Sequence, residues 1–133
     1  MLKRGPIPAI AHGVVEYVAG VLLIVAPLLV DFESRAAVAL SLAYGMTVLV
    51  LTAVSQLPSG LIPQIPVSAH MVLDFVLAGL LIASPFVFGF ADQTAPTALF
   101  IVLGIAHLLI TIGTRFEDAS AETPTKPGPA RAA

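Results

Sequence analysis

The chain has 133 residues with a formal net charge of −2, and its mean hydropathy is +1.01. Because 58% of the residues are apolar and only 11% are charged, the composition excludes an ordinary soluble domain and indicates an integral membrane protein. The 6 Lys and Arg residues lie mostly near the two ends, so nucleic-acid binding has no basic surface to rest on. The absence of cysteine excludes disulfides, thiolate metal sites and cysteine nucleophiles.

Four apolar runs, each close to the roughly 20 residues that a membrane span needs, predict four transmembrane helices. In chain order their expected bounds are 9–30, 36–54, 69–88 and 95–114. They divide the chain into an N-terminal segment (1–8), a helical hairpin (9–54), a proline-rich connector (55–68), a second hairpin (69–114) and a tail (115–133) expected to be disordered. The expected fold class is therefore an all-α membrane protein of two tandem, parallel helical hairpins.

The positions of lysine and arginine predict how the chain is oriented in the membrane. The basic residues outside the first and last spans are Lys3, Arg4, Arg115, Lys126 and Arg131. The two opposite loops together contain a single basic residue, Arg35. Because positively charged flanks are retained in the cytoplasm, both termini and the connector are predicted to be cytoplasmic, in the inner membrane of a cell. The hairpins are then related by a pseudo-twofold axis along the membrane normal.

The first helix of each hairpin carries the same sequence pattern. Residues 12–32, HGVVEYVAGVLLIVAPLLVDF, recur 58 positions later as residues 70–90, HMVLDFVLAGLLIASPFVFGF. The polar matches are His12 with His70, Glu16 with Asp74, and Pro27 with Pro85. A histidine followed four residues later by a carboxylate, at the same point of two apolar runs, indicates an internal repeat and one candidate site.

The second helices of the hairpins match more weakly, after a slip of one residue. This match pairs Gly45 with Gly104 and Thr52 with Thr111. His107 lies on the same helical face as Gly104 and Thr111. Small residues allow helix backbones to approach closely within a bilayer. These faces are therefore predicted to point into the bundle.

The turn at the end of each first helix carries a short motif. Its residues are Ser84, Pro85 and Phe86 in the second copy, and Ala26, Pro27 and Leu28 in the first. A duplicated two-helix unit with such a motif resembles the SPW repeat family of small bacterial membrane proteins, over roughly residues 12–114. The tryptophan of that motif is absent from both copies and its serine from the first. The resemblance implies a four-helix membrane fold and offers no catalytic residue to carry over.

Five ionisable residues are expected in the cytoplasmic half of the bundle, namely His12, Glu16, His70, Asp74 and His107. At about 1.5 Å per residue, the two carboxylates lie roughly 10 Å from the cytoplasmic helix ends. Ionisable groups inside a span are costly, so each is a functional candidate that needs a partner.

Several interpretations of these residues stay open. They can join helices through polar contacts, with His12 and His70 alternatively lying in wet headgroups. They can form a metal site of two histidines and two carboxylates for Zn, Mn or Fe, if the first and third spans face each other. His12, His70 or His107 can bind a tetrapyrrole. Finally, Glu16 and Asp74 can belong to a proton path.

Pro27 and Pro85 are expected to kink their helices and to disturb the carbonyls of Leu23 and Leu81, which a neighbouring serine such as Ser84 can satisfy. The sequence contains no Ser-His-Asp set, phosphate loop or HExxH motif, so no enzymatic activity and no definite cofactor are predicted. The expected function is that of a non-enzymatic accessory or scaffold subunit, in contact with lipid and with other membrane subunits or with itself. The alternative is a bundle with a metal, tetrapyrrole or proton site.

Overall fold

A computed structural model of the chain describes residues 5–116. The elements are β1 (Ile7–Pro8), α1 (Ala9–Leu29), α2 (Arg35–Val54), α3 (Val67–Val87), α4 (Thr94–Gly113) and β2 (Thr114–Arg115). All four helices are long and apolar enough to cross a membrane, which confirms the predicted spans and the all-α fold class. The expectations for residues 1–4 and for the tail from residue 117 lie outside the described residues.

The helix ends follow from local backbone chemistry. Pro8 and Pro66 stand at the N-caps of α1 and α3, where proline costs nothing because no helical partner awaits its missing N–H. Pro66 therefore starts α3 at Val67, two residues before the predicted start at residue 69. At the start of α2, the Ser34 side chain accepts a hydrogen bond from the Ala37 N–H at 3.2 Å, which is a standard N-cap.

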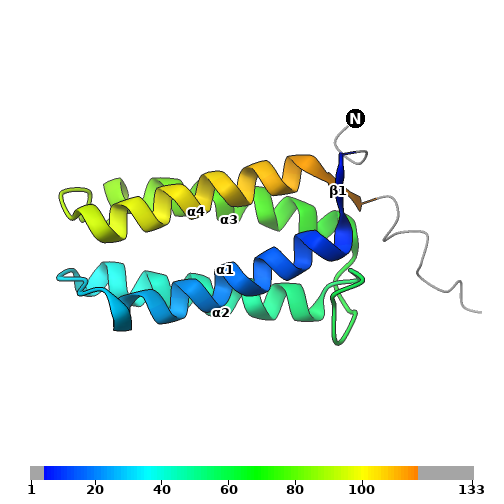
Figure 1. Ribbon diagram of the computed structural model, residues 1–133, viewed down its shortest axis with the longest axis horizontal. Helices are drawn as coiled ribbons and strands as arrows, with labels where there is room; N and C mark the ends of the chain where they lie inside the picture. The colour runs from blue at the N-terminus through cyan, green and yellow to red at the C-terminus, as the bar shows by residue number, and fades with distance from the viewer. Residues whose placement is uncertain (1–4, 117–133) are drawn as a thin grey trace, which may run out of the picture.

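The helices form two hairpins, α1 with α2 and α3 with α4, each packed along its length (Figure 1). The pairing depends on glycine. A Cβ atom built on Gly45 would lie 2.7 Å from the Gly20 carbonyl oxygen, and one on Gly104 would lie 3.1 Å from the Ala78 carbonyl oxygen. No side chain fits there without moving a backbone. The small-residue faces thus point into the bundle, as predicted.

Hydroxyl groups bond backbone carbonyls near the prolines of α1 and α3. Ser41 of α2 donates a hydrogen bond of 2.5 Å to the carbonyl of Leu23, the group that Pro27 leaves without its helical donor. In the second hairpin, the predicted bond from Ser84 to the Leu81 carbonyl is wrong. Ser84 donates instead to the carbonyl of Leu80, at 2.6 Å. Because Ser84 lies one residue before Pro85, the carbonyl four residues before Ser84 is that of Leu80, not that of Leu81.

Apolar packing closes both ends of the bundle. At the end that holds the short loops, Leu23, Leu81, Phe90 and Phe100 share a buried cluster to which all four helices contribute. At the other end, a smaller cluster forms what we call the end cap, which consists of Ala9, Leu57, Val67 and Phe116.

The strands β1 and β2 pair in parallel beside the end cap, with Ile7 opposite Thr114. Both ends of the described chain therefore lie at the same end of the bundle, as the even number of spans requires (Figure 1).

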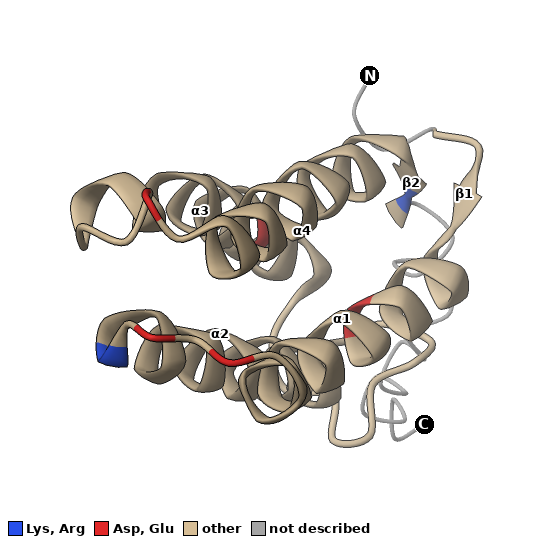
Figure 2. Cartoon of the chain, turned by 60° about the vertical axis from the view of Figure 1, so that its left-hand side comes forward, with Lys and Arg blue, Asp and Glu red and all other residues tan. Residues whose placement is uncertain are grey.

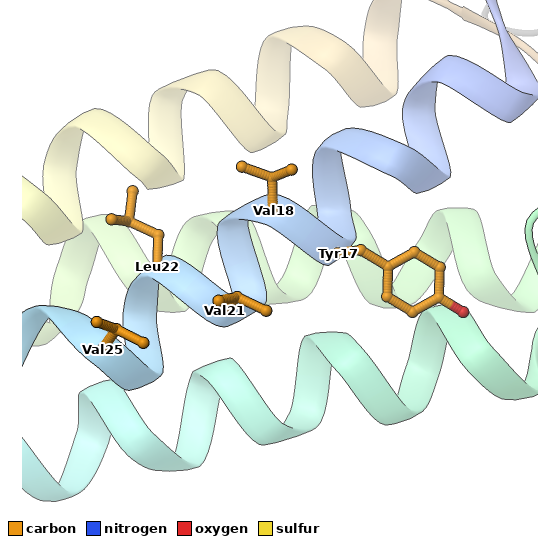
Figure 3. A pocket seen from close by; sticks show the side chains of 5 residues that line it. All are labelled: Tyr17, Val18, Val21, Leu22 and Val25. Carbon is orange, nitrogen blue, oxygen red and sulfur yellow. The ribbon is translucent and has the colours of Figure 1, made fainter.

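The outer surface of the bundle is apolar. A shallow hollow on α1 is lined by Tyr17, Val18, Val21, Leu22 and Val25 (Figure 3). Figure 2 shows that the charged positions of the described chain are few and that those inside α1 and α3 are acidic. They are Glu16 and Asp74, and Arg35 at the start of α2 is the one other Asp, Glu, Lys or Arg in the helices. A surface of this kind is stable in contact with lipid.

Candidate metal centre

The four repeat-related polar residues meet inside the bundle. His12 and Glu16 come from α1, and His70 and Asp74 come from α3. Their side chains are at most 2% exposed, so the alternative that the two histidines lie in wet headgroups is wrong. The first and third helices do face each other, which is the condition for a shared site.

The two imidazoles stand between the two carboxylates in a nearly symmetric arrangement. His12 Nε2 lies 3.4 Å from Glu16 Oε1 and 3.3 Å from Asp74 Oδ2. His70 Nε2 lies 3.3 Å from Glu16 Oε2 and 3.3 Å from Asp74 Oδ2. Each nitrogen thus faces one oxygen of its own helix and one of the other hairpin. The pseudo-twofold relation predicted from the repeat is visible in these pairs.

The fifth predicted residue joins the group from α4. His107 Nε2 lies 3.7 Å from Glu16 Oε1 and 3.6 Å from Asp74 Oδ1, and its side chain is 5% exposed. Three imidazole nitrogens from three helices therefore point at the same two carboxylates.

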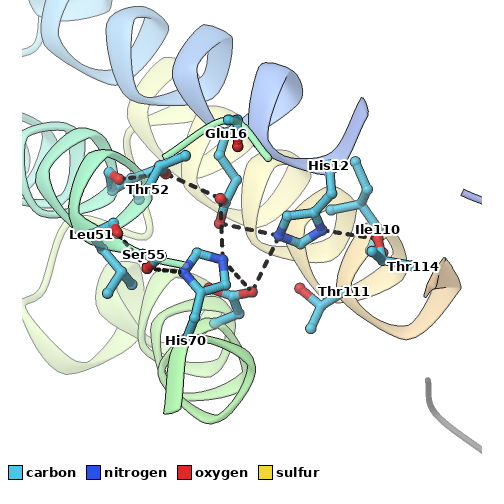
Figure 4. Close-up of polar contacts among 12 residues, drawn as sticks. His12, Glu16, Leu51, Thr52, Ser55, His70, Ile110, Thr111 and Thr114 are labelled. Atoms are coloured by element: carbon cyan, nitrogen blue, oxygen red, sulfur yellow. Dashed lines mark hydrogen bonds and ion pairs between the residues drawn. The ribbon is translucent and has the colours of Figure 1, made fainter. Parts of the chain in front are cut away.

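Hydroxyl groups behind the imidazoles fix the tautomers of His12 and His70 (Figure 4). His70 Nδ1 lies 2.8 Å from Ser55 Oγ, and the Ser55 hydroxyl gives its own proton to the Leu51 carbonyl at 2.6 Å. Because that proton is used, Ser55 Oγ accepts from the Nδ1–H of His70. The neutral ring then carries a lone pair, not a proton, on Nε2.

Thr114 acts on His12 as Ser55 acts on His70. His12 Nδ1 lies 3.0 Å from Thr114 Oγ1, and the Thr114 hydroxyl donates to the Ile110 carbonyl at 2.6 Å. Ser55 and Thr114 are the C-cap residues of α2 and α4, so they hold equivalent places in the two hairpins. In the neutral form of both rings, the Nε2 lone pairs consequently face the carboxylates.

The inner atoms of the site have no hydrogen-bond partners within the described part of the chain. They are His12 Nε2, His70 Nε2, His107 Nε2, Glu16 Oε1 and both carboxylate oxygens of Asp74. The Thr52 hydroxyl lies 3.0 Å from the remaining Glu16 oxygen, Oε2, and 2.7 Å from the Val48 carbonyl oxygen, so its single proton is shared between these two acceptors. Buried polar atoms nearly always have a partner. These atoms instead face one another at ion-pair distances of 3.3–3.7 Å, an arrangement that can hold a cation among them.

A divalent transition-metal ion fits this set. Imidazole nitrogens and carboxylate oxygens bind such ions at about 2.0–2.2 Å, and two ligands in a tetrahedron at that distance lie about 3.3–3.6 Å apart. The four contacts of His12 and His70 with the carboxylates are 3.3–3.4 Å long. Direct N–H···O hydrogen bonds to a carboxylate are usually about 2.7–2.9 Å long. The spacing is longer than that of direct hydrogen bonds and falls in the range of ligands around a common ion, with His12 and His70 approaching different oxygens of Glu16.

The other interpretations fit less well. The His12 and His70 ring centroids are 5.6 Å apart, and carboxylate oxygens occupy the space between their Nε2 atoms, which leaves no room for a macrocycle. A continuous proton path has no support in the half of the bundle that holds the short loops, where α1 and α3 carry no Asp, Glu, His, Lys or Arg and apolar side chains fill the core.

Three contributors to the site do not stand out in the sequence. Ser55 falls in the predicted connector and Thr114 at the last residue of the predicted fourth span. Phe116, whose ring lies edge-on to His12 with a centroid distance of 5.1 Å, falls in the predicted tail. A signal for two of them exists, because the one-residue slip that pairs Thr52 with Thr111 also pairs Ser55 with Thr114 when it is extended by three residues.

Comparisons with known proteins identify the repeat. The model of the SPW repeat domain matches residues 10–114. No curated protein and no solved structure gives a significant match to the chain.

Proposed function

The chain belongs to the SPW repeat family, and we propose that in this member the two repeats together bind a divalent first-row transition-metal ion inside the membrane. The ligands are His12, Glu16, His70 and Asp74, two from each hairpin. The observation that carries the proposal is the convergence of buried nitrogen and oxygen atoms that lack a hydrogen-bond partner among residues 5–116.

The proposed ion also balances the charge of the site. Two ionised carboxylates in an apolar interior carry a large desolvation cost unless a cation compensates them. A divalent ion neutralises Glu16 and Asp74 together, while the imidazoles remain neutral and coordinate through Nε2. The hydroxyls of Ser55 and Thr114 act on the opposite ring nitrogens, as the outer partners of metal-binding histidines commonly do.

We propose further that the protein is not an enzyme but an accessory or scaffold subunit of the inner membrane, with both termini in the cytoplasm. Support comes from the enclosure of the site, since its side chains are at most 5% exposed and leave no surface on which a substrate can dock. The basic residues near the two chain ends favour the cytoplasmic orientation. A bound ion in such a protein holds the hairpins together and presents one fixed apolar surface to a partner.

Elemental analysis of the purified protein tests the metal proposal. The protein extracted in mild detergent is expected to contain one equivalent of a first-row divalent ion per chain, or to bind one after chelation and addition of Mn²⁺, Fe²⁺ or Zn²⁺. The double variant Glu16→Gln with Asp74→Asn keeps the side-chain shapes and removes both charges. It is expected to lose the ion while the helical circular dichroism spectrum is unchanged.

A matched control removes two charges elsewhere. The double variant Glu33→Gln with Asp92→Asn changes exposed carboxylates in the outer loops and is expected to bind the ion as the unchanged protein does. A protein that carries no such ion and takes up none of the three refutes the proposal. Equal binding by both double variants refutes the assignment of the ligands.

The accessory role is tested by co-purification. Stoichiometric membrane partners after mild extraction support it, whereas a monomer that binds no partner in detergent or lipid nanodiscs contradicts it.

A further inference from the structure

We propose that His107 is a fifth ligand of this metal site and that it determines which ion the site selects, favouring one that takes five or six ligands, Mn²⁺ or Fe²⁺, over tetrahedral Zn²⁺. This inference rests on the proposed function.

His107 breaks the symmetry of the site. The offset that pairs Ser55 with Thr114 places Val48 at the position in α2 that His107 occupies in α4. Val48 is 1% exposed, so an apolar side chain fills this place in the first hairpin. Packing alone therefore does not call for a histidine. An imidazole buried in a membrane protein at the cost of desolvation has its explanation in what it faces.

The atoms that His107 faces belong to the metal site. Its Nε2 lies 3.6–3.7 Å from one oxygen of Asp74 and one of Glu16 and has no hydrogen-bond partner among the described residues. On Asp74 it approaches Oδ1, whereas His12 and His70 approach Oδ2. His107 thus adds a third direction of approach.

The contacts of His107 with the carboxylates are longer than the 3.3–3.4 Å contacts of the other two imidazoles and correspond to a wider angle at a shared ion. Two ligands about 2.1 Å from an ion and 120° apart are separated by about 3.6 Å. Both contacts of His107 with the carboxylate oxygens agree with this spacing to about 0.1 Å. His12, Glu16, His70 and Asp74 alone place their ligand atoms within 4.8 Å of one another, with His107 outside that group. Addition of His107 gives three nitrogen ligands and two carboxylates, which exceeds the four ligands of an ordinary zinc site.

The number of ligands changes the selectivity. For a given set of nitrogen and oxygen ligands, Zn²⁺ binds more tightly than Fe²⁺ or Mn²⁺, and proteins offset this order through geometry. Closed zinc sites in proteins are almost always tetrahedral, while Mn²⁺ and Fe²⁺ accept higher coordination. A fifth ligand on a rigid helix therefore shifts the balance toward Mn²⁺ and Fe²⁺.

The variant His107→Val tests the inference, because it gives α4 the residue that α2 already has at the equivalent place. Competition between Mn²⁺ and Zn²⁺ is measured for the full-length protein in detergent. Loss of an outer partner lowers the metal affinity of a site by about 10–100-fold. We expect loss of the direct ligand His107 to lower the Mn²⁺ affinity by a factor of this size and to leave Zn²⁺ with four ligands, so the ratio of Mn²⁺ to Zn²⁺ affinity should fall by the same factor. Ile105→Val on the exposed face of the same helix is the control and should leave the ratio unchanged.

Co²⁺ substitution provides a second readout that does not depend on affinity. Five- and six-coordinate Co²⁺ absorbs visible light more weakly than tetrahedral Co²⁺, so His107→Val is expected to intensify the spectrum. If the unchanged protein binds no ion, the proposed function fails. If it binds an ion but His107→Val alters neither the spectrum nor the Mn²⁺ to Zn²⁺ ratio, the metal site stands and the fifth ligand is refuted.

Discussion

The hydroxyl groups of Ser55 and Thr114 are expected to control metal affinity without touching the ion. Ser55→Ala removes the acceptor 2.8 Å from His70 Nδ1, and Thr114→Val removes the one 3.0 Å from His12 Nδ1. In each variant a buried N–H loses its partner, and the ring is no longer held in the tautomer that presents Nε2 to the ion. Both changes preserve the apolar part of the side chain.

The size of the effect follows from the role of such outer partners. Their loss typically lowers metal affinity by about 10–100-fold, which corresponds to about 1.4–2.8 kcal/mol. Because the two residues hold equivalent places in the two hairpins, the single variants are expected to show effects of similar size. The double variant measures the coupling between the two hydroxyls, because their histidines face the same two carboxylates.

The assay is competition of the purified variants against a metal indicator in detergent, with the helical circular dichroism spectrum as a check of the fold. Thr47→Val is the matched control, because the Thr47 hydroxyl bonds only the Ala43 carbonyl on the exposed side of α2, at 2.8 Å. Unchanged affinity in both Ser55→Ala and Thr114→Val refutes the reasoning, and so does an equal loss in the control.

Three further predictions concern stability, each measured by unfolding in mixed micelles or bicelles. Saturating metal is expected to stabilise the protein by about 2.7 kcal/mol at 100 times the dissociation constant, and a chelator should abolish the gain; a stability independent of metal contradicts a site shared between the hairpins. Ser41→Ala should cost about 1 kcal/mol but much less in the Pro27→Ala background, where the new backbone N–H can bond the Leu23 carbonyl; simple additivity of the two changes would show that the serine does not compensate for the proline. Gly45→Ala should cost about 1–3 kcal/mol because its Cβ meets the facing backbone, whereas Gly79→Ala, with nothing within 4 Å of its Cβ, should be neutral or stabilising; equal effects at the two glycines would exclude close helix packing as the cause.

The core of the candidate site is accessible from the sequence because it obeys helical periodicity. A histidine and a carboxylate four residues apart share one helical face, and parallel hairpins place both copies at the same depth. His12, Glu16, His70 and Asp74 can therefore be grouped from their spacing alone. The level of His107 follows from counting residues back from the end of the last span.

The parts that could not be predicted lie where helical periodicity stops. Ser55 and Thr114 follow the last turns of their helices, and the strands β1 and β2 are two residues long each, too short to produce an alternating pattern. The slip between the repeats also hides these residues, because the first helices align at one offset and the second helices at another. The prediction for Ser84 is wrong for a different reason, since a serine inside a helix bonds the carbonyl four residues before it.

The end cap ties the end of α4 to the buried site. The Phe116 ring lies edge-on to the imidazoles of His12 and His70, with centroid distances of 5.1 and 6.5 Å, and Thr114, two residues earlier, bonds both His12 and the Ile110 carbonyl of α4. A shift of the last turn of α4 is therefore transmitted to an imidazole on α1, which belongs to the other hairpin, through a single threonine side chain.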